Sequence, residues 1–335
     1  VPEHKKLEFS TLLADPEIRV PVDGNKFFNK HIAVVGSTGA GKSNTVTRII
    51  QTSTAKTAND TPNNSHSIIF DIHSEYKTAF PDANHIDINS LNLPYWLLNS
   101  EELEEVLLDT GERDNYNQSS IFRHLVTENK KKHNTAFTKI FYDSPVFFDI
   151  HEVLNALHNI KSETVNAKNS NLYMIDDGTY KLLSEGKTDP TTGILLDDNQ
   201  RILKYFEERL EFHPTKSQSI TNGSYADGSL DKFYTRFESK VSQERLTFLF
   251  GPNAKAATME DTLRNLLGYQ PNKTANVTVL DLSGIPFEVL SITVSLISRL
   301  IFEHGYHYKV YRTKNGETIN NDAPILLVYE EAHKY

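Results

Sequence analysis

A glycine-rich run near the amino terminus constrains the fold more than any other feature of this 335-residue sequence. The residues from Gly36 to Ser43 read GSTGAGKS and fit the pattern G-x4-G-K-[ST] at every fixed position. An apolar run, HIAVV at 31–35, precedes them, and apolar residues at helical spacing follow from Val46 to Ile50. We therefore predict a strand, a phosphate-binding loop and a helix, in that order.

The residue types of this loop suit a nucleoside triphosphate. Glycines let backbone N–H groups turn toward phosphate oxygens, and the following helix directs its positive end to the same place. We expect ATP and Mg²⁺ as cofactors, with Lys42 at the β- and γ-phosphates and Ser43 as a metal ligand. A glycine-rich turn with an exposed lysine is the alternative. The expected nucleotide-binding residues are Gly36, Ser37, Thr38, Gly39, Ala40, Gly41, Lys42, Ser43 and Asn44.

Three apolar segments end in carboxylates, which a P-loop site needs to orient Mg²⁺ and to align water. SIIFD ends at Asp71, VTVLD at Asp281, and ILLVYEE at Glu330 and Glu331. Only the last segment offers two adjacent carboxylates, so that one can face the metal while the next polarises water. We expect Glu330 near Mg²⁺ and Glu331 as the catalytic base, acting with Lys42. A strand that runs into a surface turn is the alternative, because paired glutamates are common there.

The pattern along the chain predicts an α/β fold with an insertion. From 100 to about 243, helix-like blocks alternate with polar loops, and we expect a mainly helical insertion. Strand patterns at 67–71, 275–284 and 323–331, with a helix from Phe287 to about His304, predict a mainly parallel sheet. The expected domains are 1–99, the first part of the core with the phosphate loop; 100–243, the insertion; and 244–335, the second part, which ends at the Walker B strand.

Bulk composition excludes several classes of protein. No apolar run approaches the roughly 20 residues that cross a bilayer, and the first residues lack a secretory signal, so we expect no membrane segment. The absence of cysteine excludes disulfides and agrees with the cytoplasm. A net charge of −9 argues against a surface coated with positive charge for nucleic acid. The densest basic run, KKKH at 130–133, predicts either a phosphate contact or a solvated helix end.

Four motifs resemble those of the HerA branch of the HerA/FtsK ATPases and occur in that family's order. GSTGAGKSN followed by Thr45 resembles its phosphate loop, and FDIHSEY at 70–76 resembles its D-x-x-[GS]-E-Y segment. VTVLDLSGIPFEV resembles its strand-to-helix element, and YEEAH resembles its EEAH box. These motifs cover the two ends of the ATPase core, while 100–230 match nothing specific and are assigned to the inserted helical bundle by position.

The resemblance implies a RecA-like fold and a hexameric ring with ATP sites between subunits. It implies an ATP hydrolase and helicase that translocates on double-stranded DNA, with a nuclease or sirtuin-like effector as partner, in DNA end processing or antiphage defence. A nucleotide-switched ring that scaffolds and activates an effector without translocation is the alternative. A secretion or conjugation ATPase is a third possibility.

The resemblance also implies accessory residues. Asp71 and Glu75 are expected to help orient water or to couple the site to the adjacent subunit. The alternative is that Asp71 simply ends a strand and Glu75 pairs with a surface lysine. Lys30 and Arg245 are expected to act on phosphate, with a solvated charge before a strand as the alternative for Arg245. His73 and His333 have no partners at ligand spacing, and we do not expect them to bind metal. The family's amino-terminal barrel and the arginines after its EEAH box are missing, so we read both ends as cut and assign no cis arginine.

Overall fold

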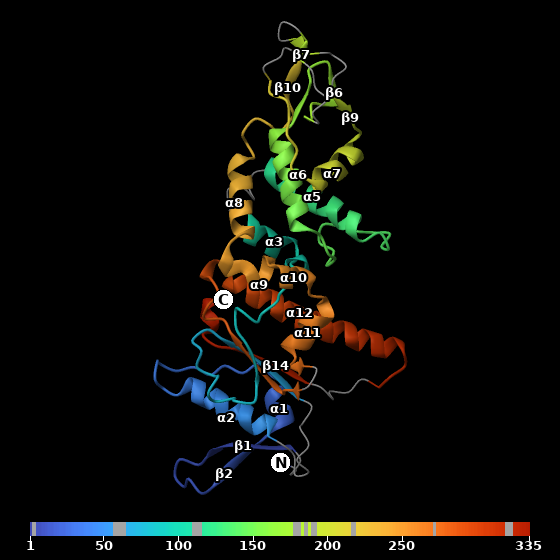
Figure 1. Ribbon diagram of the computed structural model, residues 1–335. Coiled ribbons are helices and arrows are strands. Elements are labelled where there is room, and N and C mark those ends of the chain that lie inside the picture. Colours follow the sequence, from blue (N-terminus) through green and yellow to red (C-terminus); the bar gives the residue numbers. More distant parts are fainter. Residues whose placement is uncertain are drawn as a thin grey trace. The chain divides into compact units, whose positions relative to one another are not determined.

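The computed structural model describes residues 1, 5–55, 65–108, 116–176, 182–183, 187–188, 193–215, 219–270, 273–318 and 324–335. Within these residues the chain forms two compact units, one made of Val1–Pro94 and Pro252–Tyr335 and the other of Tyr95–Gly251. The first unit holds both ends of the chain, coloured blue and red in Figure 1, and the second holds the green and yellow middle.

A parallel sheet forms the centre of the first unit. Its strand order is β14–β3–β13–β4, and each neighbouring pair runs parallel. All six residues of β3 are buried, as expected for a strand inside such a sheet. The register pairs Asp71 with Asp281 and Phe70 with Tyr329, so three strands end at the same edge. The bounds are β3 (His66–Asp71), β4 (Asn84–Ile86), β13 (Val277–Asp281) and β14 (Ile325–Tyr329).

The two longest helices of the first unit are α2 (Lys42–Thr54), which follows the phosphate loop, and α12 (Phe287–Lys314), which follows β13.

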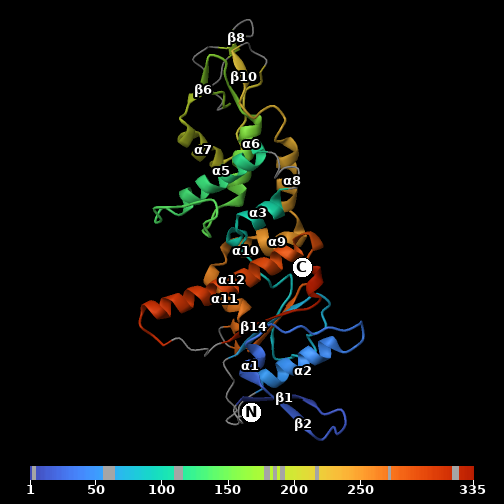
Figure 2. The same ribbon diagram turned by 180° about the vertical axis from the view of Figure 1, so that it is seen from behind.

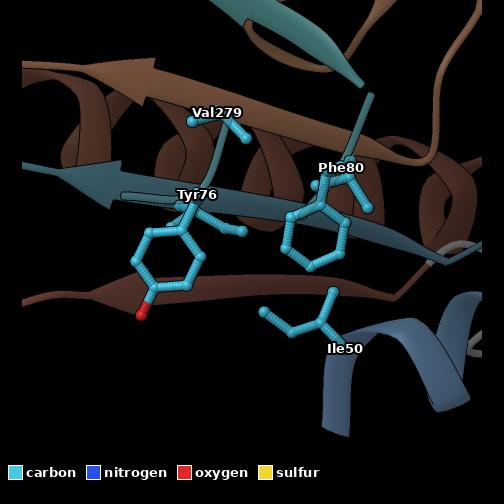
Figure 3. Packing of buried hydrophobic residues seen from close by; sticks show 6 residues of the cluster. Ile50, Tyr76, Phe80 and Val279 are labelled. Carbon is cyan, nitrogen blue, oxygen red and sulfur yellow. The ribbon is translucent and has the colours of Figure 1, made fainter. Parts of the chain in front are cut away.

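 The start of α12 and its first half supply buried residues from Val289 to Ile301. Ile50 of α2 packs with Ile69 and Val279 of the sheet and with Tyr76 and Phe80, which follow β3 (Figure 3). Because this cluster joins α2 to the turn after β3, it fixes the position of the phosphate loop relative to the sheet edge.

The predicted strand at 31–35 is wrong. Among the described residues no strand pairs with this segment, and the side chains of Ile32 and Val35 are 43% and 87% exposed. A short apolar run forms a strand only where a neighbouring edge accepts its backbone N–H and C=O groups. The helix predicted after the loop is confirmed as α2, and the three predicted strands at 67–71, 275–284 and 323–331 are confirmed as β3, β13 and β14.

The remaining elements of the first unit are short. An antiparallel hairpin pairs β1 with β2, and a second pairs β11 with β12. Thr258 and Asp261 form a capping box that starts α11. Their bounds are β1 (Lys6–Thr11), β2 (Arg19–Asp23), α1 (Gly24–Phe28), α10 (Pro252–Ala256), α11 (Met259–Leu266), β11 (Tyr269–Gln270), β12 (Lys273–Thr274) and η4 (Ala332–Lys334).

The second unit packs helices around an aromatic core. Phe122 meets Phe233 and Phe237 edge-on at 6.1 and 5.5 Å between ring centroids. Capping boxes start α3 at Asn99 and α7 at Asp197. None of the described helices in either unit is both long and apolar enough to cross a membrane. The helices are η2 (Tyr95–Leu97), α3 (Ser100–Leu107), α5 (Tyr116–His133), α6 (Ile150–Ser162), α7 (Asp198–Glu207), α8 (Asp231–Val241), η3 (Glu244–Leu246) and α9 (Thr247–Phe250).

The second unit also contains an antiparallel sheet that the sequence pattern did not predict. Its order is β10–β5–β6–β9, and a separate pair joins β7 to β8. Figure 2 labels β6, β8 and β10 of these strands. The strands are short and mostly polar, so neither an apolar run nor a clear alternation marks them. Their bounds are β5 (Thr164–Asn166), β6 (Asn169–Tyr173), β7 (Leu182–Leu183), β8 (Lys187–Thr188), β9 (Ile194–Leu195) and β10 (Ile220–Asn222).

Candidate functional site

The phosphate loop forms an open turn that leads directly into α2. Gly39 and Gly41 have φ angles of 81° and 87°, in the left-handed region that side chains disfavour. Between them the backbone N–H of Ala40 donates to the carbonyl of Ser37 at 3.1 Å. Residues 36–40 are exposed. The first backbone N–H groups of a helix have no partner within it, so this end of α2 is accessible to an anion.

The first two side chains of α2 face carboxylates from two different strands. The ammonium of Lys42 lies 3.9 Å from Oε1 of Glu331, just beyond β14, and 3.4 Å from the carbonyl of Ser37. The hydroxyl of Ser43 donates to Oε2 of Glu75, in the turn after β3, at 2.9 Å. The fold therefore gathers a cation, a hydroxyl and two carboxylates at the start of α2.

A buried pair of carboxyl groups lies behind these contacts. Asp71 is fully buried and accepts backbone N–H groups from His73 and Glu75 through Oδ1 and from Tyr76 through Oδ2. Burial raises the pKa of Glu330 to about 8, and a hydrogen bond with Asp71 and the negative charge of Asp71 add to this shift. Oε2 of Glu330 is buried without a hydrogen-bond partner among the described residues. This corner of the site is rich in oxygen atoms and poor in positive charge.

The turn after β3 is held from the next strand. Ser74 has a φ angle of 58°, and its hydroxyl donates to Oδ2 of Asp281 at 2.8 Å. Oδ1 of Asp281 accepts the backbone N–H and the hydroxyl of Ser283. Burial alone would raise the pKa of Asp281, but the hydrogen bonds from Ser283 and Ser74 outweigh it and lower the pKa. Asp281 thus fixes the turn that carries Glu75.

Two residues of this site have no clear signal in the sequence. Ser74 is a polar residue in a turn, and nothing in its identity predicts a left-handed backbone conformation. Tyr76 looks like part of the core, yet its backbone N–H also donates to Oδ2 of Asp71 at 3.0 Å. Burial and the nearby charge of Glu330 raise the pKa of Tyr76 to about 12. Both lie in FDIHSEY, so only the motif as a whole pointed to them.

Lys30 and Arg245 are exposed, and neither is a partner in the contacts described above. Lys30 follows α1 in the first unit. Arg245 lies on η3 in the second unit, and the strand expected after it is wrong, because Thr247–Phe250 form α9. Leu246, Phe248, Leu249 and Phe250 are buried, so this apolar run belongs to a helical core segment. The phosphate-related roles of both residues remain predictions.

The structure overturns the phosphate contact proposed for Lys130. Its side chain is 1% exposed, and its ammonium donates to the carbonyls of Tyr142 and Ser144. Lys132 and His133 both contact Glu152, at 2.9 and 2.7 Å. The basic run therefore holds its own unit together, a role that charge density in the sequence cannot distinguish from DNA binding.

A glycine-rich loop that opens a helix beside the carboxyl ends of a parallel sheet, with carboxylates facing its lysine and serine, is typical of P-loop NTPases. The sequence matches the family model for the central domain of the helicase HerA over residues 7–301. The chain belongs to this HerA family. It is also similar to a probable helicase of Methanocaldococcus jannaschii, with 25% identity over 99 residues. That stretch is 29% of this chain and 18% of the relative, so the match spans less than a fifth of the relative's length.

Proposed function

We propose that this chain is an ATP-hydrolysing motor that translocates on double-stranded DNA as a hexameric ring and works with a nuclease or sirtuin-like effector. The contact that supports this proposal most is the approach of Lys42 to Glu331 at 3.9 Å, next to the hydrogen bond between Ser43 and Glu75. These contacts put a phosphate-binding lysine within reach of a carboxylate that can align water. Membership of a helicase family supports the choice of DNA as the partner.

Each residue at the start of α2 has a role in this proposal. The backbone N–H groups of residues 36–44 and the ammonium of Lys42 bind the phosphates, and Glu331 orients the attacking water and accepts its proton. Asp71 holds the turn that presents Glu75. The ammonium of Lys42 already lies near Glu331. When a nucleotide binds, its phosphates must therefore compete with Glu331 for this ammonium.

The oxygen atoms present fit a magnesium ion. Mg²⁺ prefers hydroxyl and carboxylate oxygens. The site offers the hydroxyl of Ser43 and Oε2 of Glu330, which is buried and has no hydrogen-bond partner within the part of the chain that the structure describes. We propose Ser43 and Glu330 as the residues that hold the ion. When bound, Mg²⁺ would neutralise charge on the β- and γ-phosphate oxygens. Among the described residues there is no group of three or more His, Cys, Asp or Glu that could hold a metal without help from other ligands.

The openness of the site supports an arrangement between subunits. The phosphate loop is exposed, and so are Lys30 and Arg245. We propose that a neighbouring subunit covers the bound nucleotide and that one of these two cations reaches the γ-phosphate. The proposed setting is the cytoplasm, in DNA end processing or antiphage defence.

The rate of ATP hydrolysis with and without duplex DNA tests the proposal. We expect hydrolysis that duplex DNA stimulates, and we expect the Lys42→Ala variant to lose both nucleotide binding and hydrolysis. Hydrolysis that does not respond to duplex DNA at any salt concentration would contradict the motor. The mass of the particle with and without a candidate effector measures the assembly separately, and a particle of one copy would contradict the ring.

A further inference from the structure

The second half of α12 leaves the core of its unit. The buried residues of α12 end at Ile301, and none of the residues from Phe302 to Lys314 is buried. We call Phe302–Lys314 the outer segment. Both views show this end of α12 extending away from the strands of the same unit (Figures 1 and 2). A Cβ added at Gly305, in the middle of the segment, would have no atom of the described residues within 4 Å beyond its chain neighbours and its own helix backbone.

The composition of the outer segment does not favour an isolated helix. Its sequence, FEHGYHYKVYRTK, contains a glycine and several histidine, tyrosine, valine and threonine residues. Glycine in a helix interior costs about 1 kcal/mol relative to alanine, and the other types are also weaker helix formers than alanine or leucine. Short helices in water depend on packing more than on propensity. A partner that packs against the segment would supply this stabilisation.

Aromatic side chains are exposed on opposite sides of the outer segment. Phe302 and Tyr306 are four residues apart and share one face, with 73% and 58% of their area exposed. Tyr311 lies nine residues after Phe302, on the opposite side because a turn contains 3.6 residues, and it is 62% exposed. Large apolar groups on both sides favour a partner that encloses the helix over one that touches a single face.

The charge of the outer segment favours another copy of this chain. The segment carries Lys309, Arg312 and Lys314 against Glu303, and Glu317 just beyond it pairs with Arg312. The net charge from 302 to 317 is thus +1 with histidine neutral, whereas the whole chain has a net charge of −9. A second copy is therefore an acidic partner for a basic helix. Tyrosine, phenylalanine and arginine are also the residue types enriched at protein interfaces.

Nucleic acid fits the same segment less well. The guanidinium of Arg312 lies 5.6 Å from the ring centroid of Tyr308, and its Nε binds Glu317 at 2.9 Å. That cation is thus already engaged within the chain. Phosphate contacts would also leave the face of Phe302 and Tyr306 exposed to water.

We infer that the outer segment of α12 is a contact between subunits, packed against a second copy of this chain. The inference rests on the proposed function only because it requires several copies of the chain to assemble. It adds that the outer segment of α12 is one of the contacts that hold the copies together. It does not depend on hydrolysis or on DNA.

Crosslinking through an introduced cysteine tests this contact, because the chain has no cysteine of its own. The Tyr306→Cys variant is labelled with a maleimide that carries a photoreactive benzophenone, and the adducts are identified by peptide mass. The matched control is Tyr116→Cys, since Tyr116 is 83% exposed and lies on α5 of the other unit. We expect an adduct of two copies in several times higher yield from position 306 than from position 116.

A second measurement uses variants that remove the aromatic rings. We expect Tyr306→Ser combined with Tyr311→Ser to weaken self-association by at least about tenfold, measured by light scattering over a concentration series, with an unchanged circular dichroism spectrum. Tyr116→Ser should leave association unchanged. Equal adduct yields from positions 306 and 116, or adducts only with added DNA, would overturn the inference. Loss of nucleotide binding with the adduct intact would instead refute the proposed motor and leave this contact standing.

Discussion

Glu330 and Glu331 are adjacent in sequence but have different surroundings. Glu331 has a φ angle of 48°, a left-handed conformation that is uncommon for a residue with a side chain, and it faces Lys42 and His333. Glu330 lies against Asp71, and burial together with that neighbour raises its pKa to about 8. Unusual backbone conformations are often found at functional sites. Substitutions at the two positions should therefore separate hydrolysis from the other properties of the site.

The Glu331→Gln variant should bind nucleotide but hydrolyse it poorly. An amide keeps the shape of the side chain but cannot accept the proton from water, and loss of a positioned base costs roughly 10²- to 10⁴-fold in rate. Nucleotide affinity is measured by a fluorescent analogue and hydrolysis by phosphate release. Glu260→Gln is the matched control, since that exposed glutamate pairs with Arg264 on α11. Unchanged hydrolysis in Glu331→Gln would refute the role of Glu331 as base.

Lys130 provides a pH-dependent test of stability. Burial lowers the pKa of Lys130 to about 8, below its ordinary value of 10.5. Between these two values the unfolded chain holds more protons than the folded chain, so the free energy of unfolding rises with pH. Below about pH 8 the cost of the buried charge is fully present, and above 10.5 it is gone. The gain should approach about 3 kcal/mol over this window, because one pKa unit corresponds to about 1.4 kcal/mol.

A comparison of wild type with Lys130→Met isolates this effect. Urea unfolding is followed by the fluorescence of Trp96, the single tryptophan, which lies in the same unit as Lys130. The difference in unfolding free energy between wild type and variant should shift in favour of wild type between pH 7.5 and 10. Lys131→Met is the control, because Lys131 is half-exposed and its ammonium pairs with Glu128 on the surface of the same helix. An equal pH response in both variants would contradict the prediction.

At the scale of elements, the turn after β3 connects two strand ends and the phosphate loop. Asp71 organises the turn from β3, and Ser74 ties it to Asp281 at the end of β13. Glu75 then meets Ser43 at the start of α2. The geometry of the site therefore depends on one turn that contains a left-handed residue.

Substitutions at Ser74 distinguish its backbone conformation from its hydroxyl group. Ser74→Gly loses the hydrogen bond to Asp281 but fits the φ angle of 58°, whereas Ser74→Ala loses the bond and keeps a Cβ in the disfavoured region. We expect both variants to be less stable than wild type, with alanine about 1 kcal/mol worse than glycine. Urea unfolding measured by circular dichroism checks the order. An alanine variant as stable as the glycine variant would show that the turn relaxes out of the left-handed region.

Sequence patterns predict the elements of the first unit better than those of the second. SIIFD, VTVLD and ILLVY form strands because each apolar run pairs its backbone N–H and C=O groups with a neighbouring strand of the parallel sheet. HIAVV is an equally apolar run, but it forms no strand. Strand pairing depends on a free sheet edge, which is supplied by residues elsewhere in the chain. The carboxylates of the site were predictable because each follows a strand, whereas Ser74 acts through a backbone angle that no residue type announces.

The short polar strands of the second unit depend on one close approach. Gly223 follows β10. A Cβ added there would clash with the side chain of Glu163, because Oε1 and Cγ of that residue lie closer than van der Waals contact allows. Glu163 is buried and accepts a hydrogen bond from Tyr205 at 2.7 Å, so it cannot move away freely. We expect Gly223→Ala to lower the free energy of unfolding by about 1–3 kcal/mol, measured by Trp96 fluorescence.

Gly24→Ala is the control for this substitution. A Cβ at Gly24 would lie 3.6 Å from its nearest neighbours, an ordinary contact distance. Apart from the intrinsic difference between glycine and alanine, we expect Gly24→Ala to change the free energy of unfolding by no more than about 0.5 kcal/mol. A Gly223→Ala variant as stable as this control would show that the backbone near Glu163 adapts.

At the scale of the whole molecule, the proposed motor is an acidic chain that moves on DNA. Both partners are therefore negatively charged. The net charge is −9, and the densest basic run is neutralised within its own unit by Glu152 and Glu128. A ring can still present a positive lining, because six copies repeat every exposed cation. DNA binding should therefore depend on assembly more than on any local cluster in one chain.

The salt dependence of DNA binding tests this distribution of charge. Each phosphate contact that is lost lowers the slope of log affinity against log salt by about 0.9. The Lys131→Ala/Lys132→Ala double variant should keep both the slope and, to within about twofold, the affinity for duplex DNA, because these cations are held by Glu128 and Glu152. Fluorescence anisotropy at several salt concentrations measures both quantities. A slope reduced by the equivalent of one or more phosphate contacts would mean that these ion pairs open to bind DNA. The cations that contact DNA would then include Lys131 or Lys132 on α5.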